Sequence, residues 1–368
     1  MDVFLYIVKI LYYLAFVVSL FFYARHKYKK DKITKFGWVA LILFAVVFGA
    51  YAIICGPPGE STGDRSRYAV RFENTGYENF TMKSSLGLYL LQEFLHLFTW
   101  DSSVLFFVVG FLFCAINLYC YKKTEKEVPL FLLLLFSARY ALFGFFALKQ
   151  ALALAFVNLA YTAYWRDKKW WALLALVVAV LFHESALIMI PCILIAEFCK
   201  KTDKRRKILY GISAALVLLF PLIGNLFVKV ASLMPWLGSQ LANYVNGEGF
   251  LALDFNFFTI FNSLVYYVIT AVALVYRKKL KEKIENYDFF LILAIFCSVF
   301  SLLSMYMYWM FRFAMFFYVP TFILATQIYQ NIENKRKRKI FLCSVVGILS
   351  VFMIKLLVQY YFIYGGIV

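Results

Sequence analysis

The sequence has too few charged residues to form the surface of a soluble protein of its length. Only 16% of its 368 residues are charged, whereas 64% are hydrophobic and 21% are aromatic. A soluble domain carries about 25% charged and about 45–50% apolar residues, and a globule of this size still needs a polar shell. The composition and the mean hydropathy of +0.77 therefore predict an integral membrane protein. An outer-membrane barrel is excluded, because barrel strands alternate over roughly ten residues.

Motifs of several common chemistries are also missing. The sequence has no Walker A, HExxH or GxSxG motif. Its seven cysteines lie in or beside apolar blocks without a CxxC pair, so neither a disulfide framework nor a zinc site is expected. We expect no metal and no cofactor. The formal charge of +18 does not indicate a nucleic-acid partner, because the positive residues form short clusters between apolar blocks.

The apolar blocks have the length of membrane-spanning helices, which need about 20 residues to cross the hydrocarbon core. We expect an all-α, polytopic fold with a single transmembrane domain over residues 1–368. The pairs that meet near residues 147 and 184 form either helical hairpins or broken, re-entrant elements. About twelve spans are predicted, at 3–23, 36–55, 102–121, 128–146, 148–165, 169–183, 185–199, 208–229, 258–276, 289–305, 309–328 and 340–363.

The positive charges predict an orientation. Most of the 38 Lys and Arg residues fall in clusters on alternate loops, at 25–35, 122–126, 166–169, 200–207, 277–283 and 335–339. By the positive-inside rule these loops are cytoplasmic, and both termini are outside. The first block lacks the basic start and the cleavage site of a signal peptide, so we expect it to be retained as a span.

Two longer segments, 56–101 and 231–257, fall on the outer side in this topology. The first contains an apolar stretch at about 86–100 in which Glu93 and His96 lie one turn apart. We expect this stretch to form a helix lying in the outer interface of the membrane. The second, rich in aromatic residues and Asn, would cover a cavity or hold a sugar by stacking.

Two outer patterns join cations to polar groups. Asp64-Arg65-x-Arg67-Tyr68 combines a carboxylate that can accept a proton with guanidinium groups suited to phosphate; the alternative is a solvated loop with local ion pairs. Arg139 lies near Lys149-Gln150 at the junction of two spans, where a cation and an amide could hold a phosphate or a sugar hydroxyl.

Two further patterns lie at the ends of apolar runs. In His183-Glu184-Ser185 the histidine is suited to general-base work, or it caps a helix end. Tyr306-x-Tyr308-x-x-x-Arg312 brings an arginine into the outer turn of a span, for substrate binding or for cation–π packing. Charges in this region are costly, which predicts an anionic ligand that offsets them, although long side chains can also reach the headgroups.

Four short motifs carry a family resemblance. They are Asp64-x-x-x-Tyr68, Leu148-Lys149-Gln150-x-Leu152-Ala153, Phe182-His183-x-Ser185-Ala186-Leu187, and Phe311-Arg312-Phe313 with Tyr318. In order and spacing they resemble the EpsG-like branch of the Wzy-type bacterial polysaccharide polymerases. Lys149 stands where that family usually has Arg, and it keeps the charge but not the bidentate fork. The resemblance also suggests the architecture of GT-C-like membrane glycosyltransferases.

The resemblance implies a metal-independent glycosyltransferase of the bacterial cytoplasmic membrane, acting in O-antigen, capsule or exopolysaccharide synthesis. It would polymerise oligosaccharide repeat units carried on undecaprenyl pyrophosphate at the outer face, alone or beside a flippase and a chain-length regulator. The growing chain would pass to a hydroxyl of the incoming unit. The implied catalytic residues are His183, Asp64, Arg312 and Glu93, with His183 or Asp64 as the base and Glu93 as a second candidate. The implied substrate-binding residues are Arg65, Arg67, Tyr68, Arg139, Lys149, Gln150, Ser185 and Tyr308.

Other classes of membrane protein could use the same cations. A transporter or flippase of lipid-linked sugars would bind the same ligand, but such carriers commonly show repeated halves and polar residues at the midplane. Here no repeat is visible, and the ionisable residues gather toward the outer half of the spans. An outer-face ligase that moves polymer to a terminal acceptor, or a membrane acyltransferase, is the other alternative.

Overall fold

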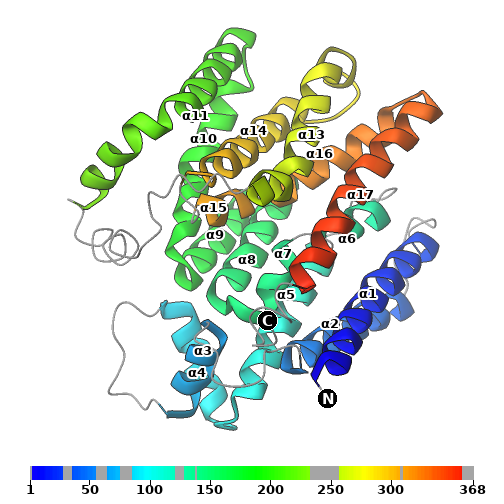
Figure 1. Ribbon diagram of the computed structural model, residues 1–368, viewed down its shortest axis with the longest axis vertical. Coiled ribbons are helices and arrows are strands. Elements are labelled where there is room, and N and C mark those ends of the chain that lie inside the picture. The colour runs from blue at the N-terminus through cyan, green and yellow to red at the C-terminus, as the bar shows by residue number, and fades with distance from the viewer. Residues whose placement is uncertain are drawn as a thin grey trace. The chain divides into compact units, whose positions relative to one another are not determined.

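The protein is helical throughout the part that the computed structural model describes, which comprises residues 2–27, 35–54, 64–74, 85–120, 128–136, 139–232, 257–306 and 310–358. Figure 1 shows these helices with connecting turns and without strands. The all-α prediction is confirmed for these residues. The chain divides into two compact units: unit 1 comprises Met1–Leu187 with Val346–Val368, and unit 2 comprises Ile188–Val345. The single transmembrane domain stays a prediction.

The helices of unit 1 follow the predicted apolar blocks, with one additional break. The predicted span 128–146 is divided into two helices, and the predicted break near residue 147 is present at Ala147, whose backbone is not helical (φ −112, ψ 63). The helices are α1 (Asp2–Lys27), α2 (Lys35–Ile54), α3 (Asp64–Asn74), α4 (Leu86–His96), α5 (Ser102–Cys120), α6 (Val128–Phe136), α7 (Arg139–Phe146), α8 (Leu148–Trp165) and α9 (Lys169–Phe182).

The helices of unit 2 also match predicted blocks. The predicted span 309–328 is divided at Phe316 and Phe317, which form a turn. Most of the predicted outer segment 231–257 lies outside the described residues. The 3-10 helix η3 (Glu184–Ile188) and the helix α17 (Lys335–Val358) each cross the boundary between the units. The other helices are α10 (Met189–Cys199), α11 (Asp203–Ser232), α13 (Phe257–Leu280), α14 (Tyr287–Leu303), α15 (Met310–Met315) and α16 (Tyr318–Asn331).

The apolar helices are consistent with an integral membrane protein. Among the described residues, Ile7–Arg25 and Ser102–Cys120 are long and apolar enough to cross a bilayer, and Trp38–Ile54, Lys169–Phe182 and Tyr287–Leu303 form shorter apolar helices. Large hydrophobic side chains are exposed on several helices, including Leu194 on α10 and Leu218 on α11. Lipid can cover such side chains, whereas large exposed apolar patches are rare on soluble proteins. The count of twelve spans stays a prediction.

Small residues bring α2 and α5 into close contact in unit 1. A Cβ atom added at Gly110 of α5 would lie 2.7 Å from the Cβ of Ala52 and 3.3 Å from the Cα of Gly49. Close approach of two backbones is the usual reason for small residues where apolar helices cross. Aromatic rings pack beside this crossing, with the Phe48 and Phe145 centroids 4.7 Å apart.

A buried polar cluster joins α5, α7 and α8. The Oδ1 atom of Asn117 accepts hydrogen bonds from the Tyr140 hydroxyl (3.0 Å) and from Nδ2 of Asn158 (2.8 Å). The Asn117 amide donates in turn to the Phe113 carbonyl at 2.7 Å. These side chains are almost completely buried, and buried polar groups stabilise a structure only when they are hydrogen-bonded. The cluster therefore fixes how the three helices face one another.

Four charged side chains link the ends of α11, α13 and α14 in unit 2. Arg277 donates to both carboxylate oxygens of Asp288, at 2.6 and 2.9 Å, and to Asp203 at 2.8 Å. Arg206 contacts both aspartates, with 3.0 Å between its Nη1 and an Asp288 oxygen. Hydrogen bonds from Arg206 and Arg277 lower the pKa of Asp203 from its usual value. Two of the predicted cytoplasmic basic clusters therefore lie at the same end of unit 2.

A third basic cluster adjoins this end. The Nζ atom of Lys283, after α13, lies 2.6 Å from a carboxylate oxygen of Glu333, just before α17. Both side chains are largely exposed. The three predicted cytoplasmic loops of unit 2 are thus joined by ion pairs, and their location on the cytoplasmic side stays a prediction.

Replacing Gly110 by Ala is expected to destabilise unit 1 by about 1–3 kcal/mol, because the added methyl group overpacks the crossing with α2. Thermal unfolding of the purified protein in detergent measures the effect. Gly211→Ala is the control, since no atom lies within 4 Å of the Cβ position on α11; it should be neutral or stabilising by about 0.5–1 kcal/mol. Equal effects of the two substitutions would contradict the close crossing.

Asp288→Asn is expected to destabilise unit 2, because it leaves the largely buried Arg206 with one carboxylate partner fewer. The cost should lie between the ~1 kcal/mol of an exposed pair and the ~3–5 kcal/mol of a broken buried pair. Glu333→Gln, which removes the exposed pair with Lys283, is the matched control in the same unfolding assay. A loss for Asp288→Asn no larger than that of the control would show that the cluster does not hold these helices.

Candidate functional site

The residues singled out in the sequence gather mainly at one end of unit 1. The starts of α5 and α8 and the end of α9 meet there with α3 and α4 around one apolar cluster. Phe72 of α3, Leu88 of α4, Leu105 of α5 and Leu148 of α8 are buried in it, and Phe182 of α9 packs against it. This end therefore places the segments around Asp64, Glu93, Lys149 and His183 on a common core.

The segment 64–74, read from the sequence as part of a loop, is the helix α3. Its signal was the spacing of Tyr68 and Phe72, which lie one turn apart and are both buried in the apolar cluster. Arg67 and Arg71 are exposed. Asp64 is the first residue of the helix, and its side chain lies outside the described structure. Tyr68 contributes to packing here, whereas Arg67 is open to a ligand.

Arg65 ties α3 to three other helices. Its guanidinium donates to the carbonyl of Phe145 at the end of α7 (2.8 Å) and to that of Ile53 at the end of α2 (3.0 Å). Its Cζ atom lies 3.7 Å from the centre of the Phe106 ring on α5. Carbonyls at helix C-termini lack partners within the helix and carry partial negative charge. Arg65 thus has a positioning role that the sequence did not indicate.

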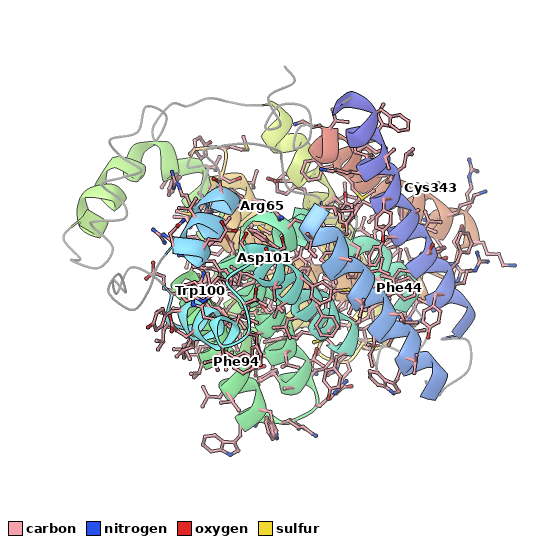
Figure 2. All side chains as sticks on the ribbon, turned by 90° about the horizontal axis from the view of Figure 1, so that it is seen from below. Phe44, Arg65, Phe94, Trp100, Asp101 and Cys343 are labelled. Atoms are coloured by element: carbon pink, nitrogen blue, oxygen red, sulfur yellow. The ribbon has the colours of Figure 1, made fainter. Side chains whose placement is uncertain are left out.

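The predicted interfacial helix at 86–100 is helical over residues 86–96, as α4. Leu86, Leu90 and Phe94 are exposed four residues apart, so they form one apolar stripe on its outer face. On the inner face, a Cβ atom at Gly87 would lie 3.0 Å from backbone atoms of Leu181 and Phe182. The backbone of α4 therefore approaches the end of α9 closely. Figure 2 shows Arg65 of α3 and Phe94 of α4.

His96 fastens α4 to the end of α3. Its Nε2 donates to the Phe72 carbonyl at 2.9 Å, and its ring contacts those of Phe72 and Trp100, at centroid distances of 4.3 and 3.9 Å. Its Nδ1 is 4.0 Å from a carboxylate oxygen of Glu93. Glu93 is half-buried beside it. His96 is therefore a structural residue, and Glu93 is the carboxylate that it flanks.

A second carboxylate at this end was not singled out in the sequence. Ser102, the first residue of α5, donates from its hydroxyl to a carboxylate oxygen of Glu73 at 2.5 Å. A negative charge beside a helix N-terminus is favourable, because the helix dipole is positive there. No pattern in the sequence paired these residues, which are 29 positions apart.

His183 ends α9 and begins η3. Its backbone is extended (φ −154, ψ 116), so the helical conformation of α9 ends at this residue. Its Nδ1 lies 2.7 Å from the hydroxyl oxygen of Ser185 and 3.2 Å from the backbone nitrogen of Ser185, which donates to it. Phe182 stacks on Phe156 of α8, with ring centroids 5.6 Å apart. His183 and Ser185, predicted together, are therefore in direct contact.

The start of α8 brings a cation and an amide to the same end. Lys149 is half-buried and Gln150 is 2% exposed, directly beside Leu148 of the apolar cluster. Arg139 is the first residue of α7, whereas Phe145 lies near the last residue of that helix. The side chain of Arg139 lies outside the described structure. Together, the imidazole, the lysine, the exposed Arg67 and the carboxylate of Glu93 can bind an anionic oxygen ligand and accept one proton.

Arg312 belongs to unit 2. It lies half-buried in the short helix α15, beside Phe313, whose ring is 5.8 Å from that of Phe300 on α14. Tyr308 lies outside the described residues. Within the described part of the chain, His, Cys, Asp and Glu side chains do not gather in threes as metal ligands do. The reaction's independence of metal stays a prediction.

Replacing Arg65 by Lys is expected to loosen α3, because an ammonium group cannot span two helix ends as the planar guanidinium does. Hydrogen bonds to charged groups contribute about 1.5–3 kcal/mol, so hydrogen exchange of the α3 amides should quicken by roughly tenfold or more. Arg67→Lys on the same helix is the control and should leave exchange unchanged, since Arg67 is exposed. Equal exchange in the two variants would exclude the positioning role of Arg65.

Comparison with known proteins adds one match. Searches of curated proteins and of solved structures returned nothing similar. The profile of the EpsG family matches residues 41–367, which is most of the chain and includes every motif described above. The predicted resemblance is thereby confirmed, and the chain belongs to the EpsG family.

Proposed function

We propose that this protein is a membrane glycosyltransferase that polymerises oligosaccharide repeat units carried on undecaprenyl pyrophosphate. Membership of the EpsG family suggests polysaccharide biosynthesis. The observation that carries the finer proposal is the gathering of Arg67, Lys149, His183 and Glu93 on helices that meet around one apolar cluster of unit 1. A diphosphate on a lipid requires cations at the membrane interface, and a transfer to a hydroxyl requires a group that takes its proton.

The direction of the helices supports an outer site. α5 and α8 begin at the site, whereas α9 ends there, so the turn between α8 and α9 lies at the opposite end of unit 1. That turn carries the basic cluster Arg166–Lys169. By the positive-inside rule the turn is cytoplasmic, and the site then faces the outside. Both termini are outside in the same orientation.

The proposed reaction is one group transfer. The acceptor hydroxyl of the incoming unit attacks the anomeric carbon of the growing chain. The bond between that carbon and the pyrophosphate oxygen breaks, and its electron pair leaves with the pyrophosphate. The proton of the hydroxyl goes to His183, Asp64 or Glu93. Arg67 and Lys149 stabilise the charge on the departing pyrophosphate, Gln150 and Ser185 orient sugar hydroxyls, and Arg65 holds α3 in place.

The substrate would reach this site from the membrane. The exposed stripe of Leu86, Leu90 and Phe94 on α4 gives an apolar surface beside the polar residues of α3. An exposed apolar stripe of this kind can be covered by lipid, and the pyrophosphate of a membrane lipid lies at the interface beside the lipid chains. A flippase and a chain-length regulator are the partners that such a pathway would supply.

The purified protein in nanodiscs, given a lipid-pyrophosphate-linked repeat unit, is expected to form a ladder of products that increases by one unit at each step. Lys149→Ala should lower the rate by roughly 10²–10³-fold, the usual loss when one group that stabilises transition-state charge is removed. Lys169→Ala is the control, because this exposed lysine begins α9 at the end opposite His183.

Two results would overturn this proposal. Substrate that binds and crosses the bilayer of a proteoliposome without being lengthened would identify a transporter of lipid-linked sugars. Transfer of finished polymer to a terminal acceptor, without growth of the ladder, would identify an outer-face ligase.

A further inference from the structure

The ring of His183 is held by hydrogen bonds that determine which of its nitrogens carries the proton. A backbone N–H group can only donate, and that of Ser185 donates to Nδ1 at 3.2 Å. A protonated Nδ1 would place two donors against each other, so Nδ1 must be the acceptor. The Ser185 hydroxyl, 2.7 Å from the same atom, therefore donates as well. A neutral imidazole that accepts at Nδ1 carries its hydrogen on Nε2.

These contacts belong to the architecture of the helix end. The His183 carbonyl accepts a hydrogen bond from the Ala186 amide at 3.0 Å, which closes the first turn of η3. His183 is thus the N-cap of this 3-10 helix, and its Nδ1 takes the position in which Asn or Asp normally presents a side-chain oxygen to the amide two residues on. The tautomer follows from this capping role and requires no ligand.

We propose that His183 acts as a hydrogen-bond donor, through Nε2–H, to an oxygen of the substrate's pyrophosphate, and that a carboxylate takes the proton of the acceptor hydroxyl. This inference rests on the proposed function. Of the groups named above as bases, it leaves Asp64 and Glu93.

The alternative, in which His183 is the base, requires an unprotonated nitrogen facing the hydroxyl. Nδ1 is engaged by Ser185, and Nε2 carries hydrogen in the tautomer that the cap selects. A phosphate oxygen, by contrast, needs a donor and has no proton to give up. An imidazole N–H aimed at it stabilises the charge that develops as the bond to the sugar breaks. His183 is half-buried, so part of its side chain is exposed.

The ring is also held in a fixed position. Its neighbour Phe182 stacks on Phe156 and packs against the apolar cluster, and the backbone of α4 at Gly87 lies against Leu181 and Phe182. A donor that is already positioned costs no reorganisation when charge develops on its ligand. The close packing of α4 on α9 therefore serves the placement of Nε2–H as well as the stability of unit 1.

With His183 as a hydrogen-bond donor, every bond and proton of the transfer is accounted for. The oxygen of the acceptor hydroxyl forms its bond to the anomeric carbon, and its proton goes to the carboxylate of Asp64 or Glu93. The bond from that carbon to the pyrophosphate oxygen breaks, and the electron pair stays on the pyrophosphate, where the Nε2–H of His183 donates to it. His183 keeps its hydrogen throughout.

The first test is spectroscopic and requires no activity. The full-length protein is labelled with ¹⁵N-histidine and placed in nanodiscs, and the two ring nitrogens of each of its three histidines are observed by NMR at neutral pH. The signals that disappear in His183→Gln identify His183. We expect a protonated Nε2 and an unprotonated Nδ1. A protonated Nδ1 overturns the inference, independently of what the protein catalyses.

The second test compares two substitutions of His183: one keeps the capping function of Nδ1, and the other keeps the hydrogen-bond donor at the position of Nε2. His183→Asn retains an oxygen for the cap but loses the donor at the Nε2 position. His183→Gln retains an N–H at about that position but cannot take a proton at neutral pH. We expect the polymerisation rate of His183→Gln to stay within about tenfold of wild type and that of His183→Asn to fall by roughly 10²–10³-fold. His183→Asn should nevertheless unfold at a higher temperature than His183→Gln, because it retains the cap.

The outcomes separate the inference from the proposed function. If wild type forms the ladder and both variants lose it equally, while both remain folded, His183 is the base and the inference is wrong. If wild type forms no ladder, the proposed function fails, and the assignment of pyrophosphate as the ligand fails with it. A ladder that persists in His183→Gln but not in His183→Asn supports both the inference and the proposed function.

Discussion

Helix ends inside an apolar protein leave backbone groups without partners, and the rest of this structure depends on how they are satisfied. The first four amides and the last four carbonyls of every helix lack a bond within it, and hydrocarbon offers none. Here side chains supply them. The Tyr13 hydroxyl donates to the carbonyl of Phe136 at the end of α6 at 2.7 Å. Arg65 serves the ends of α2 and α7, His96 serves α3, and Arg206 contacts the Lys200 carbonyl after α10.

This constraint explains why the candidate site lies where several helices end. A break in an apolar helix exposes carbonyls and amides, so polar side chains are needed there for stability alone. The same side chains carry the charges and donors that a phosphate or a sugar requires. His183 illustrates the stabilising role, because its Nδ1 accepts the hydrogen bond of the Ser185 amide at the start of η3.

The helices themselves could be predicted from the sequence. Apolar blocks separated by basic clusters gave helices at nearly all the expected positions, and the break at Ala147 was anticipated from the shortness of the flanking blocks. The break at Phe316–Phe317 was not, since the adjoining residues 313–319 are all apolar or aromatic and contain no Gly or Pro. α3 was missed because its charged residues obscured the buried pair Tyr68 and Phe72.

The sequence predicted which residues belong to the site better than it predicted what each of them does. Motif spacing selected His183 with Ser185, which are in contact. Spacing could not show that Arg65 would bind carbonyls 12 and 80 residues away, because contacts between distant segments depend on the fold. The same holds for Glu73 and Ser102.

The contacts of Arg65 also have a consequence for the order of biosynthesis. One of its carbonyl partners, Phe145, is made 80 residues later. At about 5–20 residues per second, roughly 4–16 s of translation separate the two. During that interval α3 has left the ribosome but lacks part of the surface on which it docks. The segment that carries Asp64 and Arg67 therefore completes its contacts late, only after α7 has been synthesised.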